Sequence, residues 1–163
     1  MSRATPAFVV TASILATAVA GAASGLASEG TAASKVRVII AEQGRPEPVP
    51  PRGKFVLEGA AGRDSGASVI SVGPGPRGVR DGQSFQPVSA TETLSGKQGE
   101  LTLAWNSVRV DAGGGVEILY GTWRILGGYG SGMYKNWTGG GRMAATENGN
   151  RYTIRFEGLV TRG

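Results

Sequence analysis

The chain contains neither cysteine nor histidine among its 163 residues. Without cysteine there is no disulfide, no thiol nucleophile, no thiolate metal site and no lipid-modified N-terminal cysteine. Without histidine there is no Ser-His-Asp hydrolase, no histidine general base and no histidine-ligated zinc or haem. Any chemistry must come from carboxylates, arginines, hydroxyls and aromatic rings. No catalytic arrangement of these groups is visible, so the sequence predicts no catalytic residue, no cofactor and no metal ligand.

Acidic residues are outnumbered by basic ones, 12 to 17, which gives a net charge of +5. A basic balance can indicate a nucleic-acid partner. Here the basic residues are spread singly along the chain, and no run of three occurs. This spacing indicates a generally cationic surface, and we expect no nucleic-acid partner.

Residues 1–27 have the pattern of a bacterial secretory signal peptide. Arg3 is the only charge before Glu29, and residues 7–20 form a mostly apolar stretch followed by small residues. Three tripeptides fit the cleavage rule: Ala18-Val19-Ala20, Ala20-Gly21-Ala22 and Gly25-Leu26-Ala27. The alternative is an uncleaved membrane anchor, but Ala, Ser, Thr and Gly insert weakly compared with Leu or Ile. We expect a secreted, extracellular protein, with membrane association only through a retained leader.

Glycine is abundant, with 28 residues, and it separates the rest of the chain into short strand-like segments. Residues 28–52 are predicted to be a flexible N-terminal segment with one strand, at residues 35–40, and a proline-rich linker. Residues 53–163 are predicted to form one domain of about eight strands, because period-2 alternation recurs with almost no helical periodicity. Such a chain forms a sandwich or a closed barrel. Gly121 and Gly158 lie inside predicted strands, where we expect tightly coiled barrel corners.

One of the predicted strands, at residues 100–110, changes the parity of its apolar residues near Ser107. Leu101 and Leu103 share one parity, whereas Val108 and Val110 share the other. A β-bulge produces such a shift, so we predict a bulge near Ser107.

Three segments in order resemble motifs of one family: 59–66 with an Asp-Ser-Gly turn, 93–103 with a Ser-Gly-Lys-Gln-Gly turn, and 121–142 with a G-x-W-x-I…G-x-G-x-Y…G-x-G pattern. Together they resemble the allene oxide cyclase-like and dirigent-like barrel superfamily, in particular its small secreted bacterial members. The resemblance covers residues 53–161. It implies an all-β, eight-stranded antiparallel closed barrel, often oligomeric, with a cavity or a small apolar interior. It implies no activity, because a fold does not dictate function.

Five of the eleven aromatic residues lie close together in the sequence: Tyr120, Trp123, Tyr129, Tyr134 and Trp137. One interpretation is an aromatic rim at a barrel mouth, which would bind an apolar or sugar-like ligand. The other is core packing, with a short helical turn over residues 133–137 that plugs one barrel end. The five are the candidate ligand-binding residues, and both interpretations stay open.

Carboxylates are the remaining candidates. Four glutamates lie in or beside predicted strands: Glu58, Glu92, Glu100 and Glu117. Two that pointed inward could act as general acid and base. Beside Arg109 or Arg124 they would instead form exterior cross-strand ion pairs, which is what we expect. Asp64, in a glycine-flanked segment, is expected to be a turn residue rather than a catalytic one.

These observations favour an exported β-barrel that binds a small apolar or amphipathic ligand and has no assigned chemistry. Two alternatives stay open. One is an isomerase or cyclase that acts on a hydrophobic substrate inside the barrel. The other is a self-associating structural protein of the cell surface that forms homo-oligomers. The direction in which the charged side chains of the strands point would separate these functions.

Overall fold

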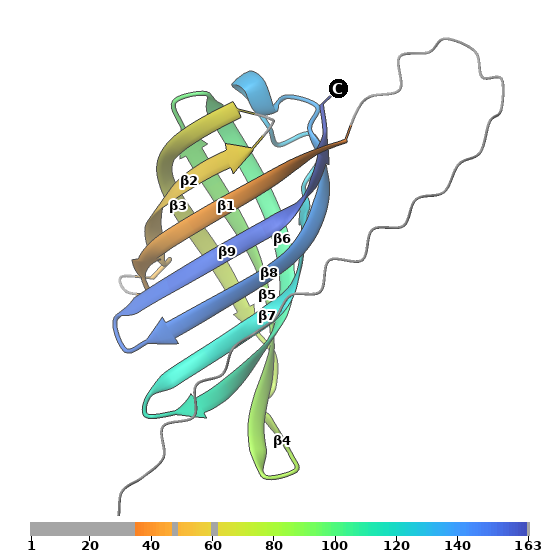
Figure 1. Ribbon diagram of the computed structural model, residues 1–163. Coiled ribbons are helices and arrows are strands. Elements are labelled where there is room, and N and C mark those ends of the chain that lie inside the picture. The colour runs from red at the N-terminus through yellow and green to blue at the C-terminus, as the bar shows by residue number, and fades with distance from the viewer. Residues whose placement is uncertain (1–34, 47–48, 60–61, 163) are drawn as a thin grey trace, which may run out of the picture. The chain divides into compact units, whose positions relative to one another are not determined.

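The computed structural model describes residues 35–46, 49–59 and 62–162 (Figure 1). These residues form nine strands and one 3-10 turn: β1 (Lys35–Arg45), β2 (Arg52–Gly59), β3 (Gly62–Pro74), β4 (Gly78–Arg80), β5 (Gln83–Gly96), β6 (Gly99–Gly113), β7 (Val116–Ile125), η1 (Gly132–Tyr134), β8 (Thr138–Asn148) and β9 (Arg151–Thr161). The predicted signal peptide, residues 1–27, lies outside the described residues. Within the described part, no helix is long and apolar enough to cross a membrane.

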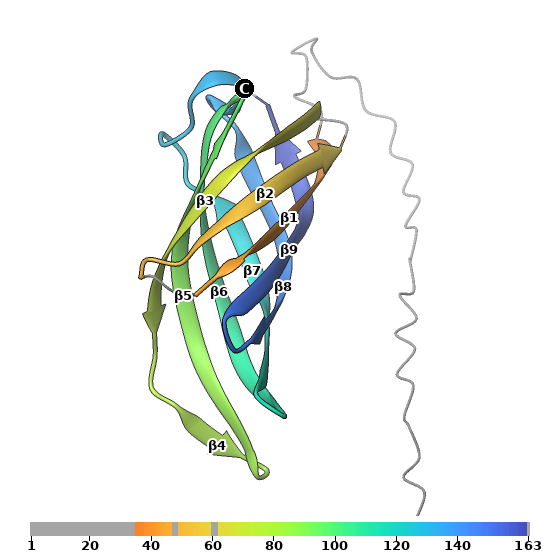
Figure 2. The ribbon, with the colours of Figure 1, turned by 90° about the vertical axis from the view of Figure 1, so that its left-hand side faces the viewer.

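Eight of the nine strands form a closed antiparallel barrel (Figure 1). They pair in the order β1-β2-β3-β5-β6-β7-β8-β9, and β9 pairs back onto β1. The short β4 pairs only with the beginning of β5, and the two project beyond the barrel as a hairpin (Figure 2). The prediction of an all-β, eight-stranded antiparallel closed barrel is confirmed, and η1 is the short helical turn expected near residues 133–137.

Strand β1 belongs to the barrel, whereas the sequence analysis began the barrel at residue 53. It pairs with β2 on one side and with β9 on the other. Arg45 and Arg52, on either side of the proline-rich segment, are register partners. That segment therefore connects two adjacent strands rather than two parts of the chain. Proline lacks the amide donor that pairing within a β-sheet requires, but a connection between strands needs no such donor. Prolines are therefore tolerated here.

The alternation of side chains in β6 continues further than the sequence suggested. Ser107 is buried, and Arg109 also faces the barrel interior, where it lines a pocket. The register shift comes only after Asp111. Val108 lies on the outer face, opposite Tyr120 of β7. The bulge predicted near Ser107 is therefore wrong in position: apolar residues on the outer wall, not an irregular backbone, caused the change of parity.

Two glycines within strands allow close contact between strands, as predicted. A Cβ atom on Gly121 would meet the carbonyl oxygen of Asn106 and lie 2.6 Å from the Cα atom of Ser107. A Cβ atom on Gly158 would lie 2.8 Å from Cζ2 of Trp123. Any larger residue at these positions would displace backbone or a buried ring.

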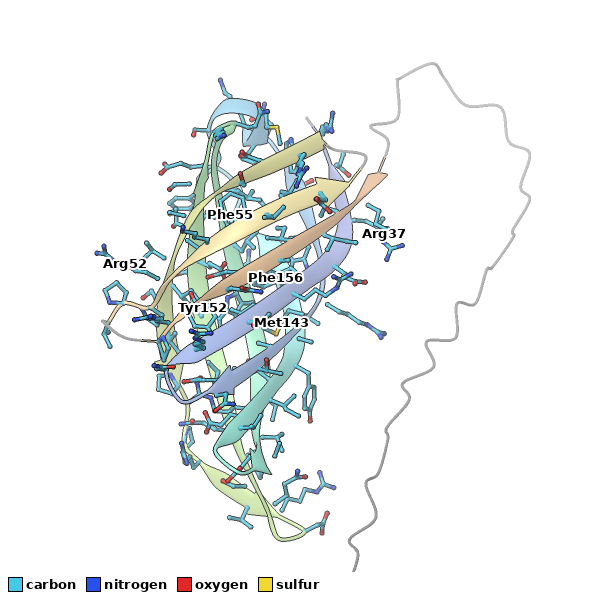
Figure 3. The ribbon with its side chains drawn as sticks, turned by 60° about the vertical axis from the view of Figure 1, so that its left-hand side comes forward. Arg37, Arg52, Phe55, Met143, Tyr152 and Phe156 are labelled. Atoms are coloured by element: carbon cyan, nitrogen blue, oxygen red, sulfur yellow. The ribbon has the colours of Figure 1, made fainter. Side chains whose placement is uncertain are left out.

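The two ends of the barrel differ. At one end, the closed end, η1 lies over the strands (Figure 1), and Tyr134 and Trp137 are buried in the core. At the other, the open end, lie the connections β1–β2, β6–β7 and β8–β9 (Figure 1). The core between them draws apolar side chains from all eight barrel strands, among them Phe55 and Phe156 (Figure 3).

Candidate functional site

The five aromatic candidates do not surround one site. Trp123, Tyr134 and Trp137 are buried in the core. Tyr120 and Tyr129 are exposed, at 54% and 69%. The rings of Tyr134 and Trp137 pack edge to face with centroids 5.0 Å apart, as core aromatics often do. The structure thus places three of the five in the core and two on the outside.

Asp64 holds the closed end together. It lies in β3 and is 4% exposed. Its carboxylate accepts hydrogen bonds from the Tyr134 hydroxyl at 2.7 Å and from the backbone amides of Ser65, Lys97 and Gln98 at 2.7, 3.0 and 3.2 Å. Burial acts to raise the pKa of Asp64, but these hydrogen bonds outweigh it and the pKa is lowered. Asp64 is thus a buried anchor for η1 rather than a turn residue.

The open end contains an apolar pocket of about 390 Å³. Its inner wall consists of aliphatic side chains from five strands: Ile70, Val88, Leu119, Ala145 and Ile154. Pro50 and Pro51 of the β1–β2 connection line it as well. Two lining residues, Trp105 and Tyr152, combine an aromatic face with a hydrogen-bond donor. The volume lies within the range of sites for small molecules.

Trp105 and Tyr152 connect this pocket to two buried glutamates. Glu42 of β1 is 1% exposed, and Glu92 of β5 is 0% exposed. The Tyr152 hydroxyl donates to Glu42 Oε1 at 2.6 Å, and the Trp105 indole donates to Glu92 Oε2 at 3.1 Å. Ser68 of β3 also donates its hydroxyl to Glu42 Oε1. Tyr152 lies inside the barrel in Figure 3, where Arg37 and Arg52 point outward.

The surroundings of Glu92 favour its protonated form. Burial raises the pKa of Glu92 well above its usual range, and the hydrogen bond and negative charge of Glu42 raise it further, against a smaller lowering by Trp105. By contrast, Glu42 Oε1 accepts hydrogen bonds from the hydroxyls of Ser68 and Tyr152. Glu42 Oε2 and Glu92 Oε1 have no hydrogen-bond partner among the described residues. Two hydroxyl donors on Glu42 Oε1 are what a carboxylate accepts, so we expect the pair to hold a negative charge inside the barrel.

Two glycines make room for this pair. A Cβ atom on Gly53 would lie 2.7 Å from both Glu42 Oε1 and the Tyr152 hydroxyl oxygen. A Cβ atom on Gly44 would collide with the Tyr152 side chain. The two glycines are register partners on β1 and β2. The backbone is therefore shaped to accept buried polar side chains at this level of the barrel.

Of the four glutamates considered in the sequence, only Glu92 is buried. Glu58 and Glu100 are exposed, and Arg124 is exposed as well. Glu58 pairs with Arg63 at 3.4 Å on the outer surface, as expected of a cross-strand ion pair. The interior carboxylate pair is formed instead with Glu42.

Glu42 was not among the candidate residues, although the sequence contains a signal for it. Val38 and Ile40 are buried on β1. Residues two apart on a strand share a face, so the same alternation places residue 42 inside the barrel. The proline-rich segment that follows made this strand look separate from the domain, and the alternation was not followed to its end.

Ionic contacts occupy the mouth of the pocket. Arg109 Nε lies 3.3 Å from Glu117 Oε2, and the Arg109 guanidinium donates to Glu147 Oε2 at 3.1 Å. Glu117 and Glu147 are register partners, so their side chains face each other. Burial raises the pKa of Glu147, Arg109 lowers it, and Glu117 raises it, with a net increase. Arg77 Nη2 lies 3.6 Å from Glu117 Oε1. Arg109 is therefore already neutralised by carboxylates.

No family model matches the chain, and no curated protein or solved structure matches it either. Across the residues that the structure describes, no group of three or more His, Cys, Asp or Glu side chains is placed to hold a metal ion.

Proposed function

We propose that this protein binds a small apolar or amphipathic molecule in the open-end pocket. The observation that carries the proposal is the apolar pocket of about 390 Å³ at the end of the barrel opposite η1. By volume it would hold about a dozen water molecules. Their release from apolar walls favours binding of an apolar group. Ile70, Leu119 and Ile154 provide aliphatic contacts, and the rings of Trp105 and Tyr152 provide aromatic ones.

Binding is proposed in preference to catalysis. An isomerase or cyclase would need two available ionisable groups beside its substrate. The ionisable lining residues Arg109 and Glu147 are already paired with each other, which leaves Glu42 and Glu92 as candidates. Neither lines the pocket, however; both are reached through Trp105 and Tyr152. A catalytic acid or base needs hydrogen-bond access to the reacting group.

Export and family membership are part of the same proposal. The N-terminal pattern over residues 1–27 supports secretion through a cleaved leader. The three motif segments, at residues 59–66, 93–103 and 121–142, support membership of the allene oxide cyclase-like and dirigent-like superfamily. A closed eight-stranded antiparallel barrel is consistent with that membership.

The test is a titration of the purified full chain with the neutral fluorescent probe N-phenyl-1-naphthylamine. Ala145→Leu adds a side chain into the pocket, whereas Ala144→Leu adds the same group on the outer face of the same strand. We expect saturable binding to the wild type and to Ala144→Leu, and binding at least about tenfold weaker to Ala145→Leu, because the added side chain occupies the cavity. Equal binding by the two variants, or no saturable binding to the wild type, would overturn the proposal.

A further inference from the structure

The charged residues that are fully buried in the described part of the barrel are of one sign. Glu42, Asp64 and Glu92 are buried, while no lysine or arginine is buried among the described residues. Asp64 lies at the closed end, where it accepts four hydrogen bonds. The charge of the Glu42–Glu92 pair lies toward the pocket, and hydroxyl and indole donors, not a cation, accompany it.

Among the described residues that line the pocket, no cation is free either. Arg109 is the sole cation among the described residues that line the pocket, and Glu117 and Glu147 both bind it. Arg77, whose side chain is 65% exposed, completes a group of two positive and two negative charges. Arg45 lies near the mouth but is exposed, so water and salt screen its charge. The net formal charge close to the pocket is therefore that of the buried pair.

We propose that the open-end pocket selects amphiphiles with a cationic amine head group over those with a carboxylate head group. This inference rests on the pocket binding a ligand as proposed above. The polar ends of Trp105 and Tyr152 donate to the glutamates, so the negative charge lies directly behind the pocket wall. A charge in apolar surroundings acts over several ångströms with little screening. It attracts an ammonium group in the pocket and repels a carboxylate, for which the described lining residues offer no unpaired cation.

Packing alone does not account for the pair. The adjacent inward positions on β5 are the apolar residues Ala90 and Leu94, and the adjacent inward position on β1 is Ile40. An apolar residue at position 42 or 92 would need no buried donors. Burying two carboxyls costs free energy that an apolar pair would not. The two carboxyls lie beside the pocket, so selection of a cationic ligand gives a reason why this cost in free energy is retained.

The test compares three ligands of equal chain length, decylamine, 1-decanol and decanoate. Each displaces N-phenyl-1-naphthylamine from the full chain at pH 7.5, below its micellar concentration. We expect decylamine to bind about tenfold more tightly than decanoate, with decanol between them. Decanol binding reports the pocket, and the amine-to-carboxylate ratio reports the charge. No decanol binding would count against the pocket itself. Decanol binding with a ratio within about twofold would overturn the charge inference alone.

Variants of the pair locate the source of the preference. Glu92→Gln leaves the Glu42 carboxyl and its hydroxyl donors in place, whereas the double variant Glu42→Gln/Glu92→Gln leaves no carboxyl. We expect the ratio to persist in Glu92→Gln and to fall to about one in the double variant. A folded double variant that keeps the wild-type ratio would overturn the assignment to the pair. If the double variant does not fold, the wild-type ratio still decides whether the preference exists.

Discussion

Tyr134 and Asp64 lie 70 residues apart and are joined by a hydrogen bond of 2.7 Å. Tyr134 ends the η1 turn, and Asp64 lies in β3. Further bonds join the η1 region to the β5–β6 hairpin, from the amides of Ser131 and Met133 to the carbonyls of Glu100 and Gln98. The closed end of the barrel is thus fastened to two hairpins.

Removal of this hydrogen bond should weaken the closed end. Tyr134→Phe keeps the ring and its contact with Trp137 but takes a donor from a buried carboxylate. We expect the free energy of unfolding in urea to fall by about 1–3 kcal/mol. Tyr129→Phe is the matched control, because Tyr129 is exposed, and it should change stability by less than about 0.5 kcal/mol. Similar losses in both variants would contradict the assigned role of Tyr134.

A rise in pH above the usual glutamate range should destabilise the protein through Glu92. Because the pKa of Glu92 is raised in the folded state, the folded chain binds more protons than the unfolded chain above the usual glutamate range. The free energy of unfolding should therefore fall as pH rises from about 5 to 8. Glu147, whose pKa is also raised, contributes in the same direction.

Urea titrations at several pH values measure how much Glu92 contributes to this decrease in the free energy of unfolding. In Glu92→Gln the decrease over this range should be shallower, because the neutral amide has no proton to lose. Glu58→Gln, at an exposed ion pair, should keep the wild-type slope. A Glu92→Gln slope equal to that of the wild type would show that Glu92 is ionised in the folded protein.

Substitution of Gly121 should cost more than substitution of a glycine in a loop. In Gly121→Ala the new methyl group would meet the backbone of Asn106 and Ser107 on the neighbouring strand. We expect a loss of about 2 kcal/mol or more in the free energy of unfolding, as for overpacked cores. Gly127→Ala has open space around the new methyl group and should be close to neutral. A neutral Gly121→Ala would mean that the strands separate there without strain.

The barrel could be predicted from the sequence because the patterns that indicate it lie within short stretches of the chain. Period-2 alternation over β9, in Tyr152, Ile154 and Phe156, records which face of a strand is buried. Gly121 and Gly158, inside such strands, record where backbones approach. Each of these signals can be read within a few residues.

The site depends on relations between distant strands, which local patterns do not contain. Glu42 and Glu92 meet only because β1 and β5 line the same interior, and neither strand pairs with the other. Proximity in sequence was misleading for the aromatic residues. Tyr120 and Trp123 are three residues apart on β7, so alternation places one outside and the other inside.

The pairing of β9 with β1, with Val38 opposite Gly158, sets the order in which this chain can fold. Without Arg151–Thr161, one edge of β1 has no partner and Glu42 lacks the hydroxyl of Tyr152. Joining two strands so far apart in the sequence costs loop-closure entropy that local contacts do not offset. The pairing of β9 with β1 therefore completes both the ring of strands and the environment of the buried carboxylates.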